Sequence, residues 1–146
     1  KRFMPSGAMV AGQVDTLHWM SFGSPEMLPL LYENQPALMT KGSQQAVVRV
    51  GVMTKDPSAR EAQAINWSTV PEGHALTVRM SGLIWPEAAS RIANSAYVTR
   101  ERVGKGQVIL FSGQPNFRGS TRGVGRIWLN ALVYGAGLGT SAKVAL

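Results

Sequence analysis

The sequence predicts an α/β domain in which helices flank a mixed, partly antiparallel sheet, and three observations near its C-terminal end carry this prediction. Gln107–Phe111 is an almost unbroken run of β-branched and large apolar residues, the pattern of a strand buried on both faces. Gly104 belongs to a tight turn before it, because glycine reaches positive φ without a Cβ clash. Thr121–Tyr134 predicts an amphipathic helix, since apolar residues recur there at helical spacing. These are Val124, Ile127, Trp128, Ala131 and Leu132.

The first forty residues predict short strands joined by loops. Ala8–Val14 is a weak strand candidate, and Ala37–Thr40 is a short one. Ser24 is placed to cap a helical turn that begins with proline. Met27–Tyr32 is strongly apolar, but Pro29 would remove a ladder hydrogen bond from a central strand. We therefore expect this segment to be an edge strand.

The middle of the chain combines two strand patterns with a polar stretch. Ala46–Met53 is a convincing strand, and Leu76–Met80 alternates as a strand does. Lys55–Trp67 has few apolar residues, while Asp56 and the proline after it could start a helix. This segment is expected to be either a short helix or an exposed insertion. Pro71–Gly73 reads as a turn.

The later elements form a hairpin followed by a loop and a helix. Glu87–Ala93 is predicted to be helical because Pro86 precedes it. Tyr97–Val103 is expected to pair antiparallel with Val108–Phe111 across the short turn. The polar loop Ser112–Gly119 then follows the carboxyl end of a strand. Open α/β sheets usually place their binding sites at such ends, so this loop is the expected binding region.

Four stretches of the chain are similar to a known family. They read G-K-G-Q-V-I-L-F-S-G-Q-P-N-F-R-G from Gly104, continued by T-R-G-V-G-R-I-W-L-N-A-L, then R-F-M-P-S-G-A at Arg2–Ala8, H-W-M-S-F-G-S-P-E at His18–Glu26 and S-G-L-I-W-P-E at Ser81–Glu87. They resemble the C-terminal domain of bacterial zinc carboxypeptidases, the carboxypeptidase A-like metallopeptidases. In that group a class I glutamine amidotransferase-like domain follows the peptidase domain. The similarity is weakest between Thr40 and Gly73.

The resemblance implies part of a flavodoxin-like, amidotransferase-like domain, and a parent protein that is a secreted, periplasmic or extracellular, zinc metallocarboxypeptidase active in proteolysis. The residues for either chemistry are missing from this sequence. Neither His18 nor His74 opens the H-x-x-E pair that such a zinc site needs, and the chain has no Cys for an amidotransferase nucleophile. We therefore expect no catalytic residue, no metal ligand and no cofactor on this fragment. Zinc is implied only for the parent's peptidase domain.

The loop before the last helix supplies the candidate site. Gln114 and Asn116 offer amide hydrogen bonds, and Arg118 offers a planar guanidinium suited to a carboxylate or phosphate. Arg122 lies at the start of the helix, whose first backbone N–H groups are free to bind an anion. These four residues form a candidate anion site.

A structural role is the competing hypothesis for Arg118. In that reading it pairs with a carboxylate such as Glu87 or Glu26 and fixes the loop, and we favour this reading because structural ion pairs use the same geometry. His18, beside Trp19, is expected to be packed or to face solvent, since no recognised nucleophile lies near it in the sequence.

Residues 1–146 are expected to form a single domain, an excised C-terminal piece of a longer protein, because the chain begins at Lys1 without a signal-like run. The formal net charge is +7, and from Arg91 onward eight basic residues stand against one acid. We expect this charge to face an acidic surface of the parent or to keep the protein soluble. The expected partners are the parent's peptidase domain and other copies of the fragment. We expect no nucleic acid and no membrane span.

The predicted function is a non-catalytic accessory or binding domain of a secreted zinc carboxypeptidase-like protein. Two alternatives from other classes stay open. The chain could be a hydrolase in its own right, using a Ser, His18 and a carboxylate in an unrecognised set. It could also be a polyanion-binding domain that depends on the C-terminal charge.

Overall fold

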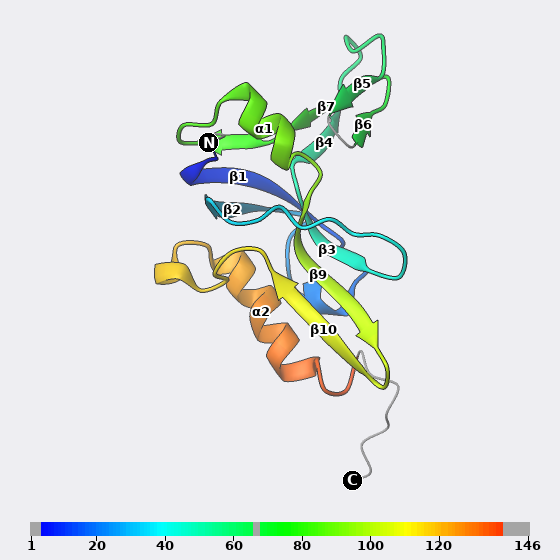
Figure 1. Cartoon of the computed structure of the whole chain (residues 1–146), viewed down its shortest axis with the longest axis vertical. Helices are drawn as coiled ribbons and strands as arrows, with labels where there is room; N and C mark the ends of the chain where they lie inside the picture. The colour runs from blue at the N-terminus through cyan, green and yellow to red at the C-terminus, as the bar shows by residue number, and fades with distance from the viewer. Residues whose placement is uncertain (1–3, 66–67, 139–146) are drawn as a thin grey trace.

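The structure is a computed structural model that describes residues 4–65 and 68–138 (Figure 1). The strands in chain order are β1 (Ser6–Val14), β2 (Met27–Glu33), β3 (Gln45–Val50), β4 (Val52–Lys55), β5 (Gln63–Ile65), β6 (Ser68–Val70), β7 (His74–Thr77), β8 (Arg79–Ser81), β9 (Ala96–Val103) and β10 (Gly106–Phe111). The α-helices are α1 (Pro86–Ile92) and α2 (Arg122–Tyr134), and the 3₁₀ turns are η1 (Trp19–Ser21) and η2 (Phe117–Gly119).

The main sheet has six strands in the order β10-β9-β3-β1-β2, with β8 also pairing β1. Every ladder between its strands is antiparallel. Antiparallel neighbours can be joined by short turns, whereas parallel strands need long crossovers. The parallel contact recorded in the described residues is an isolated bridge between Gly12 and Gly51. The α/β expectation is thus confirmed in its coarse form, but the sheet is antiparallel and the flavodoxin-like arrangement is not confirmed.

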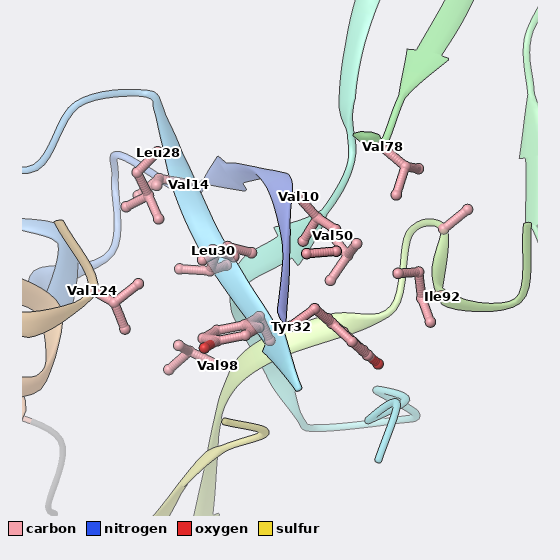
Figure 2. Close-up of a cluster of buried hydrophobic side chains, with 14 of the residues drawn as sticks. Val10, Val14, Leu28, Leu30, Tyr32, Val50, Val78, Ile92, Val98 and Val124 are labelled. Atoms are coloured by element: carbon pink, nitrogen blue, oxygen red, sulfur yellow. The ribbon is translucent and has the colours of Figure 1, made fainter. Parts of the chain in front are cut away.

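The hydrophobic core runs through the sheet from α2 to α1. Adjacent residues Val47 and Val48 of β3 are both fully buried, so both faces of this strand are covered. Figure 2 shows the cluster, to which both helices and strands β1, β2, β3 and β9 contribute. Its labelled members are Val10, Val14, Leu28, Leu30, Tyr32, Val50, Val78, Ile92, Val98 and Val124.

Helix α2 confirms the predicted amphipathic segment, with one change in which residues face inward. Val124 and Ile127 are fully buried, as expected. Leu132 is 60% exposed instead, and Asn130 takes an inward position with 6% exposure. The helix packs against η1 and β2. It lies in the lower half of Figure 1, whereas α1 lies in the upper half.

The prediction that Gln107–Phe111 is buried on both faces is wrong. β10 is an edge strand of the sheet, and Val108 and Leu110 on its outer face are 43% and 50% exposed. The hairpin between β9 and β10 is confirmed, with paired residues from Gly106 and Val103 onward. Met27–Tyr32 is the edge strand that its proline predicted.

Two predicted strands are each divided in the structure. Ala46–Met53 becomes β3 and β4 because Gly51, between them, has a φ of 95° that extended strands do not adopt. Leu76–Met80 becomes β7 and β8, divided at Val78. The strands β4 and β7 pair with each other, and β5 pairs with β6, so this part of the chain forms an arm beyond the main sheet (Figure 1).

Other local expectations have mixed outcomes. Ser24 caps no helix, and the helical turn comes earlier, at η1. Lys55–Trp67 is an exposed insertion up to β5 and not a helix, since the Asp56 carboxylate holds a turn by accepting hydrogen bonds from Ser58; Trp67 lies outside the described residues. Ala37–Thr40 makes a single bridge and not a strand. Within residues 4–65 and 68–138, no helix is long and apolar enough to cross a membrane.

Candidate functional site

The four residues of the predicted anion site do not converge on one hollow. Gln114 lines one hollow, and Arg122 lines another. Asn116 precedes η2 and its side chain makes no capping hydrogen bond. Arg118 lies within η2 with a φ of 48°, and its guanidinium carbon is 5.0 Å from the centre of the Phe117 ring. The loop therefore holds its arginine against an aromatic ring and not over a shared anion site.

The carboxylate partner expected for Arg118 is not found in the part of the chain that the structure describes. Glu26, one of the two named partners, instead accepts a hydrogen bond of 3.4 Å from the Gln13 amide. The ring of Phe117 next to Arg118 in sequence provides a cation–π contact that needs no acid. The ion pair that was expected to fix this loop is thus replaced by a cation–π contact between the neighbouring residues Arg118 and Phe117.

The hollow at Gln114 has a volume of about 470 Å³ and lies between the end of β2 and the loop after β10. Glu33 and Gln35 form its first wall, and residues 111–115 form its second. The Gln35 side chain is held firmly, because its Oε1 accepts from the Glu33 backbone N–H at 2.6 Å and its Nε2 donates to the Leu31 carbonyl at 3.2 Å. A carboxylate in the wall disfavours an anionic ligand.

Gly113 lets the loop approach this wall closely. A Cβ at this position would lie 2.7 Å from the Tyr97 hydroxyl oxygen and 2.9 Å from Nε2 of Gln35. The Tyr97 hydroxyl donates to the Leu31 carbonyl at 3.2 Å, and the Ser112 backbone N–H donates to the Tyr97 carbonyl at 2.9 Å. Contacts between segments far apart in sequence thus fix the loop, and any side chain at residue 113 would disturb them.

The second hollow, which we call the arginine cleft, has a volume of about 400 Å³ and lies between α2 and the loop Gly23–Pro25. Arg122 and Arg126 line it one helical turn apart, together with Leu129. Both arginines are exposed. Sequence reasoning singled out Arg122 but missed Arg126, which has the i+4 spacing that places it on the same helix face.

Asn130 holds the loop wall of the arginine cleft against α2. Its Nδ2 donates to the Met20 carbonyl at 2.8 Å and to the Phe22 carbonyl at 2.9 Å. These two bonds satisfy carbonyls at the end of η1. Sequence reasoning missed this residue, although a polar residue three positions after Ile127 on an apolar face is a recognisable signal.

His18 lies at the start of the short helical turn η1. It precedes η1, where its Nδ1 accepts a hydrogen bond of 3.2 Å from the Met20 backbone N–H. Burial lowers the pKa of His18 from its usual value, while Asp15 and a hydrogen bond with Gln45 act in the opposite direction. Of the two expected environments for His18, packed or facing solvent, the structure has the packed one, since this residue is only 9% exposed.

A polar chain continues from His18 under the end of α2. Arg100 donates from Nη1 to the Gln45 side chain at 3.2 Å and from Nε to Gln107 Oε1 at 2.9 Å. Gln107 Nε2 in turn donates to the Gly135 carbonyl at 2.6 Å. This series of side-chain hydrogen bonds therefore connects β3, β9 and β10 to the C-terminal end of α2.

Within the described ranges, 4–65 and 68–138, no group of three or more His, Cys, Asp or Glu side chains could hold a metal ion. No protein-family model, curated protein or solved structure matches this chain.

Proposed function

We propose that this chain is a non-catalytic accessory domain that docks against a second domain through the outer face of α2. The observation that carries this proposal is that α2 is apolar on opposite sides. Val124 and Ile127 are buried in the core, while Leu129 and Val133 on the outer side are 54% and 61% exposed. Large apolar residues that gather in exposed positions on one face are typical of an interaction surface. The outer face of α2 therefore suits a partner that covers it.

The proposed partner is the peptidase domain of a parent zinc carboxypeptidase-like protein. This part of the proposal, like membership of the amidotransferase-like group and a periplasmic or extracellular location, is supported by the sequence resemblance. The sheet of this chain is antiparallel, so the proposal places no flavodoxin-like nucleotide or nucleophile site on it. Proteolysis and zinc belong to the parent's peptidase domain in this proposal.

The test begins with the gene that encodes the chain. An H-x-x-E peptidase domain encoded upstream is the expected result, and its absence would refute the proposed partner. The upstream domain and this chain are then produced separately and mixed, and their association is measured by sedimentation velocity. Leu132→Glu should weaken association, because Leu132 is 60% exposed beside Leu129 and Val133 and the change places a charge among these apolar side chains.

The matched control is Leu83→Glu, at a similarly exposed leucine in the loop before α1. It should leave association unchanged. Equal weakening by both variants would show that α2 is not the docking face. Light scattering of the isolated chain at high concentration provides a further readout, because a second copy could cover the same face. A dimer that Leu132→Glu abolishes, without association to the upstream domain, would overturn the proposed partner.

A further inference from the structure

The arginine cleft has more positive charge than its surroundings neutralise. Arg122 and Arg126 lie four residues apart on α2, so their like charges are neighbours on one helix face. Neither has an ion pair or side-chain hydrogen bond with another residue in the described chain. No acidic residue of that part of the chain lines the cleft, and the first turn of α2 contains none.

This placement opposes the stability of the helix. Arg122 is the first residue of α2, where the partial positive charge of the helix end disfavours a cation. Thr121, at the capping position, makes no side-chain hydrogen bond with the helix. Two unpaired like charges at i and i+4 add a further unfavourable interaction. An anion bound between the two guanidinium groups would reverse the sign of both effects.

The loop wall is shaped to let one guanidinium approach. Gly23 has a φ of 71°, and a Cβ on it would lie 3.3 Å from Nη1 of Arg126. Asn130 fixes this loop through the Met20 and Phe22 carbonyls. Arg126 therefore lies over a loop that Asn130 holds in place and whose Gly23 leaves room for the guanidinium.

The rest of the cleft is apolar. Leu129 and Pro25 line it, and Phe22, next to Gly23 in the loop, is 71% exposed. A free inorganic anion would use the arginines but not these side chains. A peptide that carries both carboxylates and apolar side chains would use both.

We infer that the arginine cleft binds an acidic, amphipathic peptide segment, with carboxylates on Arg122 and Arg126 and an apolar side chain against Leu129. The cleft adjoins the proposed docking face, because Leu129 belongs to both, but the inference does not depend on the proposed peptidase partner. The guanidinium fork is suited to bidentate contacts with carboxylates.

The test uses a fluorescent peptide that alternates Glu and Leu, with a Gln and Leu peptide of equal length as the uncharged control. Binding to the whole chain is measured by fluorescence anisotropy. The Glu peptide should bind and the Gln peptide should not. The double variant Arg122→Gln, Arg126→Gln should weaken binding at least about fivefold, the expected effect of two exposed ion pairs of modest strength. Added salt should weaken it as well.

The matched control is Arg118→Gln, because Arg118 is an exposed arginine of the same chain that lies outside the cleft. It should leave binding unchanged, and equal weakening would refute a specific site. The double variant should also keep or raise the melting temperature, since it removes like charges from the helix start. Unchanged binding of the Glu peptide by the double variant Arg122→Gln, Arg126→Gln would overturn the inference. Equal rises in melting temperature with inorganic phosphate and with the Glu peptide, both lost in the double variant, would overturn the peptide in favour of a simple anion.

Discussion

Asn130 is the residue whose replacement should show most clearly how the loop and α2 are held together. Its buried amide donates to two carbonyls, Met20 at 2.8 Å and Phe22 at 2.9 Å. Asn130→Ala removes both donors and leaves both carbonyls without these partners. An unsatisfied buried polar group costs about 1–3 kcal/mol. The Phe22 bond is only partly buried, so we expect a total loss of about 2–4 kcal/mol in the free energy of unfolding.

The assay is thermal and urea unfolding followed by circular dichroism. For a chain of this length, 1 kcal/mol changes the melting temperature by about 3 °C, so the midpoint should fall by about 6–12 °C. The matched control is Asn116→Ala, because the Asn116 side chain makes no capping hydrogen bond. This control should stay within about 0.5 kcal/mol of wild type. Equal midpoints for the two variants would refute the assignment of the loop contact to Asn130.

Three further predictions concern close packing and pH. Gly113→Ala should destabilise the fold by about 1–3 kcal/mol in a urea titration, because its Cβ would lie 2.7 Å from the Tyr97 hydroxyl oxygen. Gly106→Ala should have little effect in the same titration, because the atom nearest to its Cβ, the Val103 carbonyl oxygen, would be 3.8 Å away. Burial raises the pKa of both Tyr32 and Tyr97 to about 12, so the unfolded chain loses these protons first. The contribution of these two phenols to the free energy of unfolding should therefore be fully present below pH 10 and be lost as the pH rises towards 12. Tyr32→Phe should reduce this loss. A free energy of unfolding that does not change over this pH range would contradict the burial of the phenols. The lowered pKa of His18 has the opposite consequence: stability should fall as the pH drops below about 6.5, because the unfolded chain binds the proton more readily, and His18→Asn should lose this dependence.

Local patterns in the sequence predicted the elements that depend on neighbouring residues. The hairpin from Tyr97 to Phe111 followed from a glycine turn between two apolar runs, and the edge position of β2 followed from Pro29. The burial of β10 could not be predicted in the same way. An apolar run shows that a strand can be buried on both faces, but its neighbours in the sheet decide whether it is.

The candidate site was harder to predict because it combines distant segments. Arg122 was recognised from its place at a helix start, but its neighbours in the cleft come from the loop at Gly23. Asn130 holds this loop against α2 by donating hydrogen bonds to carbonyls more than 100 residues earlier in the chain. Nothing in the local sequence around Arg118 distinguishes a carboxylate partner from the Phe117 ring that it contacts.

The arm formed by β4 to β7 leaves and returns to the main sheet at the same residue of β1. The Gly51 backbone N–H donates to the Ala11 carbonyl at 2.7 Å, and the Ala11 N–H donates to the Val78 carbonyl at 2.8 Å. Because Ala11 anchors both ends, the register of β1, β3 and β8 is set at the base of the arm and does not depend on the length of its outer loops. The arm is thus a natural place for inserting a reporter or an affinity tag without disturbing α2 at the other end of the molecule (Figure 1).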